Sequence, residues 1–145
     1  MSAGHVEEVS AKLVGLKPSI PSCFPRKLRC LLEIDRWKAT EYRQFLLYTG
    51  TVVLFGMPRP DLYNHVLCLS VASCILVSPT LARLYSNYGK GLLAHFVRQA
   101  SILYGNESLV YNVHSLLDLA DEVHEYGTLD KYSAFPFENY MQHLK

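Results

Sequence analysis

The segment Val66-Leu-Cys-Leu-Ser-Val-Ala-Ser-Cys-Ile-Leu-Val77 is the most apolar part of the chain, and the fold can be predicted outward from it. A helix is expected over Asp61–Val77, because Pro60 precedes it and Ser78-Pro79 ends it. Its apolar surface runs nearly all round, as in the central helix of a core. A bilayer span takes about 20 apolar residues, and this segment closes earlier. The sequence therefore predicts a buried central helix and no membrane contact.

Two further segments carry helical signals. Apolar residues recur at the helical period of 3.6 between Thr80 and Leu103, where Gly89 and Gly91 favour a kink or a division into two helices. Helical signals run from about Asp35 to Phe55 and could form one helix of about 18 residues, which Gly50 and the β-branched residues after it interrupt. No stretch alternates polar and apolar residues as a strand does. The predicted fold class is mainly α, with four to five helices.

The N-terminal region has a different composition. Residues 1–12 are small and polar and are expected to be disordered. Lys17–Pro25 contains three prolines and should form an extended N-terminal arm. We therefore expect a disordered N-terminus followed by one helical segment over residues 13–145.

The overall composition excludes several classes of protein. Of 145 residues, 50% are hydrophobic and 19% are charged, which argues against a disordered chain. The net charge of +1 provides no general attraction for nucleic acid. The four cysteines lack the CxxC spacing of zinc or redox motifs, and the N-terminus has no signal-peptide apolar run. An intracellular protein with free thiols is expected.

A polar stripe follows the helical period within Leu109–Tyr126. It consists of His114, Asp118, Asp121 and Glu125. An imidazole and carboxylates one turn apart can share a divalent ion or act as acid and base. The same pattern is typical of a solvated acidic helix face, and both interpretations stay open. The acidic end would lie near the helix C-terminus, where a nearby cation would relieve the unfavourable dipole.

The stretch Ser133-Ala-Phe-Pro-Phe-Glu-Asn-Tyr140 joins three aromatic residues, a proline and one carboxylate. Pro136 suits the first position of a helix and would put Glu138 in the first turn, where backbone N–H groups favour an ionised carboxylate. Such a carboxylate beside apolar anchors suits a metal ligand, and it is also what an ordinary helix start looks like. Glu138 is therefore a candidate metal-binding residue.

The tightest basic cluster is Arg26-Lys-Leu-Arg29. Together with Lys38, its side chains Arg26, Lys27 and Arg29 are candidates for contacts with DNA phosphates. A solvated loop is the alternative interpretation of the same residues.

Four blocks of the sequence carry a resemblance to a known family. They are Asp35–Gly50, Leu103-Tyr-Gly105, Tyr111-Asn-Val-His114 and Ser133–Tyr140. In order and spacing these blocks resemble the C-terminal part of animal transposase-domain proteins, related to the CACTA-type cut-and-paste DNA transposases. The resemblance covers about residues 13–145.

The resemblance implies the helical C-terminal part of an RNase H-like transposase, a nuclear DNA-binding enzyme of transposable elements. Such enzymes use three carboxylates and two Mg²⁺ ions to cleave phosphodiesters. Glu138 would be the third carboxylate, and His114 would be a neighbouring ligand or proton relay. Asp118, Thr51 and Leu28 depart from the family pattern, and Asp118 puts a shared imidazole role in doubt.

The other two carboxylates of such a site are expected on strands upstream of this chain. We therefore expect a fragment or remnant of a transposase, which completes a nuclease site only when it is joined to a catalytic core. The isolated chain is expected to have no activity and to bind no cofactor. The alternative is a domesticated or orphan helical module that binds a protein partner, or a second copy of itself, through exposed apolar surface.

Overall fold

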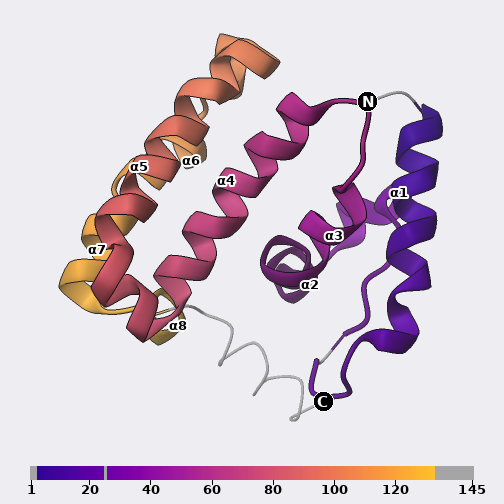
Figure 1. Ribbon diagram of the computed structural model, residues 1–145, viewed down its shortest axis with the longest axis horizontal. Helices are drawn as coiled ribbons and strands as arrows, with labels where there is room; N and C mark the ends of the chain where they lie inside the picture. The colour runs from indigo at the N-terminus through magenta and orange to yellow at the C-terminus, as the bar shows by residue number, and fades with distance from the viewer. Residues whose placement is uncertain (1–2, 25, 133–145) are drawn as a thin grey trace. The chain divides into compact units, whose positions relative to one another are not determined.

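The computed structural model describes residues 3–24 and 26–132 (Figure 1). These residues are helical and contain no strand, which confirms the mainly α prediction. They form eight α-helices in place of four to five, because 3₁₀ and π turns divide two of the predicted helices and because Ala3–Gly15 and Leu129–Tyr132 form two further helices. Where the sequence predicts one segment, the chain divides into two compact units. We call them the N-terminal unit, residues 3–24 and 26–58, and the C-terminal unit, residues 59–132.

Helix α1 (Ala3–Gly15) begins the N-terminal unit, where the sequence predicts disorder over residues 1–12. Val9 and Leu13 lie one turn apart and are buried. The Ser10 hydroxyl accepts a 3.2 Å hydrogen bond from the backbone N–H of Leu31. A helix of this length is marginal on its own in water, so these tertiary contacts stabilise it. The predicted extended arm also contains a helical turn, the 3₁₀ helix η1 (Lys17–Ser19).

The predicted helix over Asp35–Phe55 is present in four pieces. The 3₁₀ helix η2 (Leu31–Arg36) is followed by α2 (Ala39–Gln44), the π-helical turn η3 (Phe45–Thr49) and α3 (Gly50–Leu54), the last three without a break. Gly50 permits the wider turn, because a Cβ there would lie 2.7 Å from the carbonyl oxygen of Phe45. The predicted interruption near Gly50 is therefore a π turn inside a continuous helix.

The N-terminal unit contains an ion pair between the buried Glu41 and the half-buried Arg29. Arg29 donates two hydrogen bonds to the Glu41 carboxylate, from Nε to Oε1 at 2.9 Å and from Nη2 to Oε2 at 2.7 Å. Oε2 also accepts the backbone N–H of Lys38 at 2.9 Å, so Glu41 caps the start of α2. Beside the pair, the Trp37 ring packs against Tyr42 and its indole N–H donates to the carbonyl oxygen of Cys30.

The C-terminal unit is built on the helical pair α4 (Pro60–Val77) and α5 (Pro79–Tyr104). Ser78 ends α4 and begins α5, and its hydroxyl accepts the backbone N–H of Leu81 at 3.4 Å. The first helix matches the predicted Asp61–Val77 within one residue. The core joins α4, α5 and α7 through buried apolar side chains, namely Ala72, Ile75, Leu76, Ala82, Leu93, Ala120 and Val123.

Helix α4 differs from its prediction in one respect. Among the described helices it is the one long and apolar enough to cross a membrane by length and composition, so the argument that this segment is too short does not hold. A core helix of a soluble protein passes the same test. One third of α4 is buried, and this part includes His65. The His65 Nε2–H donates to the carbonyl oxygen of Phe96 at 2.9 Å, and Nδ1 accepts from the Tyr104 hydroxyl at 3.2 Å.

The last described segment departs most from prediction. In place of one helix over Leu109–Tyr126 the chain forms three short helical pieces, α6 (Tyr111–His114), η5 (Ser115–Leu117) and α7 (Leu119–Tyr126). The 3₁₀ helix η4 (Asn106–Ser108) precedes them and α8 (Leu129–Tyr132) follows them. The Ser115 hydroxyl donates to the backbone carbonyl of Asn112, a local side-chain bond that competes with a continuous helix.

Candidate functional site

The exposed face of α5 is the strongest candidate for a functional surface. Five large apolar side chains on it are between 37 and 70% exposed: Leu81, Leu84, Tyr85, Tyr88 and Ile102. At about 100° per residue they fall within one sector of the helix, and we call them the α5 stripe. Single exposed apolar residues are ordinary, but an aligned series along one helix is typical of a protein-interaction surface.

The buried face of α5 consists mainly of small residues. Ala82, Gly89 and Ala100 are buried, together with Leu93 and Val97. A Cβ on Gly89 would lie 3.5 Å from Cγ2 of Ile75, so α4 and α5 pack closely at this point. The helical period from Thr80 to Leu103 therefore predicted the helix correctly, although most of the large apolar residues that produce the pattern face solvent.

The α5 stripe is bent at Tyr85. This residue has non-helical backbone angles, φ −131° and ψ 16°, and the kink lies here instead of at Gly89 or Gly91. The bend separates Leu81 and Leu84 from Tyr88 and Ile102, with the exposed His95 between the last two. The surface thus combines apolar side chains with phenol and imidazole groups that can form hydrogen bonds.

The N-terminal unit contains an apolar pocket of about 420 Å³ beside the π turn. Phe24, Tyr48 and Val52 contribute to its walls. Thr49 also lines it, but the Thr49 hydroxyl oxygen is buried and has no hydrogen-bond partner in the described part of the chain. Because that oxygen is not accessible, the pocket offers apolar surface and little polar chemistry.

The predicted DNA-binding residues do not form one free basic cluster. Arg26, Lys27 and Lys38 are exposed. Arg29 is bound to Glu41, and its Nη2 also donates to the backbone carbonyl of Arg36. A phosphate contact by Arg29 would have to compete with this ion pair, so only the other three side chains are available for such a contact without a rearrangement.

The predicted metal stripe is not assembled as a helix face. His114 ends α6, while Asp121 and Glu125 lie in α7, and Asp118 precedes that helix. All four side chains are exposed, and the described residues contain no group of three His, Cys, Asp or Glu side chains that could hold a metal ion. The solvated-face interpretation is therefore the one that fits.

Asp121 has a different environment from the one predicted. It lies in the first turn of α7, where the helix dipole favours a carboxylate, and it forms a 2.5 Å ion pair with Lys90 of α5. The unfavourable dipole expected at the acidic end of the stripe therefore does not apply to Asp121, whereas Glu125 lies in the last turn of α7. The candidate Glu138 lies outside the described residues, and so does the rest of the block Ser133–Tyr140.

Comparison with protein-family models, with curated proteins and with solved structures finds no match for this chain. The function must therefore be inferred from its own residues. The sequence signal that could have revealed the α5 stripe is that α5 has two different faces, one with large apolar residues and one with small residues. Small residues at Ala82, Gly89 and Ala100 form a second face, and helices can pack most closely through such residues.

Proposed function

We propose that this chain is a helical protein-interaction module that associates with a second copy of itself through the α5 stripe. The exposure of the five stripe side chains carries this proposal. Complete burial of a large apolar side chain such as Leu or Ile contributes about 1.5–3 kcal/mol when it is calculated from the surface removed from water. The entropy lost on association offsets part of this gain. The commonest homo-oligomer is a two-fold symmetric dimer, in which the same surface of both copies forms the interface.

The arrangement of the stripe supports an antiparallel pairing of α5 helices. Such a pairing brings the Leu81 end of one copy to the Ile102 end of the other, with Gly91 near the midpoint. Gly91 is exposed, and a Cβ there would have no neighbour within 4 Å in the described part of the chain, so none of these residues requires a glycine at this position. A glycine within a helix costs about 1 kcal/mol relative to alanine, and a close helix crossing explains its presence.

Sedimentation equilibrium of the full chain tests this function. The stripe is smaller than a standard interface, so we expect a dissociation constant of about 10–100 µM. Tyr88→Lys should weaken association about tenfold or more, because it places a charge in the apolar contact. Tyr111→Lys is the matched control, since Tyr111 is 84% exposed on α6 and outside the stripe. A chain that stays monomeric throughout the series would falsify the proposal.

Gly91→Ala tests whether the two α5 helices of the proposed dimer cross closely at Gly91. Alanine should raise the stability of the monomer by about 1 kcal/mol through helix propensity. At a close crossing the added methyl group should at the same time weaken association. Tighter association of this variant would show that the crossing does not lie at Gly91.

The four sequence blocks favour a second function, that of a transposase-derived segment. In this proposal Glu138 supplies one carboxylate to a two-metal Mg²⁺ site that cleaves DNA in the nucleus, once an upstream catalytic core supplies the others. In a protein joined to such a core, Glu138→Gln should lower Mg²⁺-dependent cleavage by about a hundredfold or more. Equal cleavage by the variant would remove Glu138 from the site. The interaction function does not depend on this outcome.

A further inference from the structure

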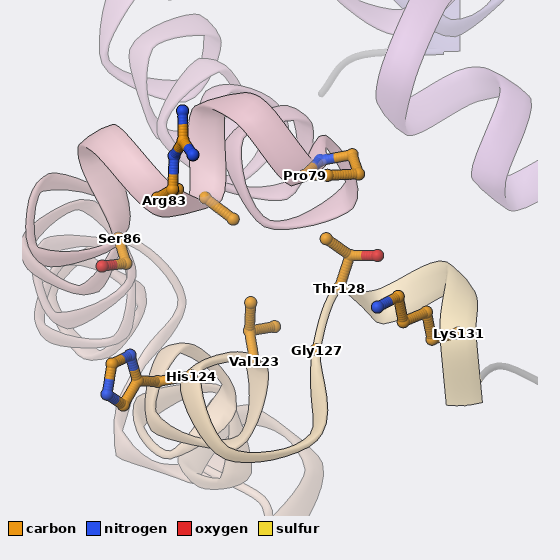
Figure 2. Close-up of a pocket in the computed structure, with 9 residues that line it drawn as sticks. Pro79, Arg83, Ser86, Val123, His124, Gly127, Thr128 and Lys131 are labelled. Atoms are coloured by element: carbon orange, nitrogen blue, oxygen red, sulfur yellow. The ribbon is translucent and has the colours of Figure 1, made fainter.

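A crevice of about 270 Å³ lies between the start of α5 and the turn that joins α7 to α8 (Figure 2). Its floor is formed by Ala82, Val123 and Thr128, which are all buried. Val123 lies between the two walls in Figure 2, and Ala82 and Val123 belong to the core of the C-terminal unit. The floor is therefore mainly apolar and partly formed by the core, and it can contact a flat or branched apolar group.

The rim of the crevice is basic. Arg83 contributes from α5, His124 from α7 and Lys131 from α8, and all three are exposed. Among the residues that the structure describes, no carboxylate lines the crevice. Two permanent cations and one imidazole around a shared opening attract an anion, and arginine and lysine are the side chains that bind phosphate oxygens most often.

The stem of Lys131 lies close to Gly127 at this rim. Gly127 has φ +93°, a conformation that favours glycine, and a Cβ on it would lie 2.8 Å from Cδ of Lys131. The lysine stem therefore passes directly over the backbone of Gly127. In Figure 2 the Lys131 ammonium points back toward the Gly127–Thr128 turn, while the Arg83 guanidinium extends outward from the opposite wall. An anion held between the two cations therefore requires the exposed Arg83 side chain to rotate toward the crevice.

We propose that this crevice binds an aryl phosphate monoester, with the aromatic ring on the apolar floor and the phosphate between Lys131 and Arg83. The phosphate requires the basic rim, and the ring requires the floor, so neither inorganic phosphate nor a neutral aromatic alcohol uses the whole site. The crevice does not include any residue of the α5 stripe. This binding activity is thus separate from the proposed self-association.

Phenyl phosphate is the probe for this site. Titration of the isotopically labelled full chain, followed by amide chemical shifts, should show saturable changes at Gly127 and Thr128. Binding should be about tenfold tighter than that of inorganic phosphate or benzyl alcohol, because each of these lacks half of the interaction. Equal affinity for inorganic phosphate would show that the floor contributes nothing and would overturn the proposal, as would the absence of saturation.

Substitutions at exposed positions test the rim without affecting the fold. Lys131→Gln and Arg83→Gln should each weaken phenyl phosphate binding about tenfold. Arg98→Gln is the matched control, because Arg98 is exposed on the same α5 helix but does not line the crevice. If Arg98→Gln weakens binding as much as Lys131→Gln, the effect is one of general charge and the site does not exist.

A phosphotyrosine peptide identifies the source of the ligand. This peptide carries the same aryl phosphate as the small probe. Tighter binding of the peptide than of phenyl phosphate supports the site and indicates a phosphorylated protein as its natural ligand. Equal binding also supports the site and indicates a free metabolite. Failure of both to bind overturns the proposal.

Discussion

Replacing Leu93 with alanine should lower the free energy of unfolding of the C-terminal unit by about 3–4 kcal/mol. Leu93 is 0% exposed and lies in the core that joins α4, α5 and α7. The substitution removes the Cγ carbon and its two methyl groups and leaves a cavity, and both effects destabilise the folded state. Urea unfolding followed by far-ultraviolet circular dichroism measures the change.

Leu84→Ala is the matched control for this prediction. Leu84 lies on the same helix and is 60% exposed, so its truncation removes little buried surface. Both variants should be measured at protein concentrations below that of self-association, because Leu84 belongs to the α5 stripe. An equal loss of stability for the two variants would mean that the buried and exposed faces of α5 are assigned wrongly.

Replacing Glu41 with glutamine should destabilise the N-terminal unit by about 2–3 kcal/mol at neutral pH. The Glu41 side chain is 1% exposed, and its carboxylate accepts three hydrogen bonds from Arg29 and from the Lys38 backbone. An amide has one acceptor oxygen, so at least one of these donors faces an amide N–H in the variant. The expected loss is below that of a fully buried pair, because about a third of the Arg29 side chain is exposed.

Tryptophan fluorescence provides a readout specific to this unit. Trp37 is the one tryptophan of the chain and packs against Tyr42 and Phe45, next to the ion pair. Glu8→Gln serves as the control, since Glu8 pairs with Lys12 on the exposed surface of α1. Exposed ion pairs contribute little to the free energy of unfolding. The midpoint of urea unfolding, followed by tryptophan fluorescence, should therefore be the same for Glu8→Gln and the parent chain.

The Glu41 ion pair also predicts a pH dependence. Hydrogen bonds from Arg29 lower the pKa of Glu41 below its ordinary value of 4.5, burial acts in the opposite direction, and the Lys38 backbone N–H adds to the lowering. Because the pKa is lower in the folded state, the stabilisation is fully present above about pH 4.5 and is lost as the pH falls through the folded pKa. Between pH 7 and acidic pH, the free energy of unfolding of the Glu41→Gln variant should therefore fall less than that of the parent chain.

Local chemistry explains which elements could be predicted from the sequence. The ends of α4 follow from Pro60 and from Ser78-Pro79, since proline acts on the residues beside it whatever the rest of the fold does. The helical period of α5 is likewise a local property. The helix predicted over Leu109–Tyr126 failed because the Ser115 side chain and the turn at Ser115–Leu117 divide it, and apolar periodicity does not detect such a division.

The sequence by itself determined the helical class, the helix α4 and the helical character of the segments around Gly50 and Gly89. The tertiary structure alone decided that Arg29 meets Glu41 across twelve positions of the chain, because an ion pair depends on distance in space. It also decided which face of α5 is buried. A helical period shows that two faces exist, but α4 packs on the one where Ala82 and Gly89 permit close approach, and this leaves the large apolar side chains in solvent.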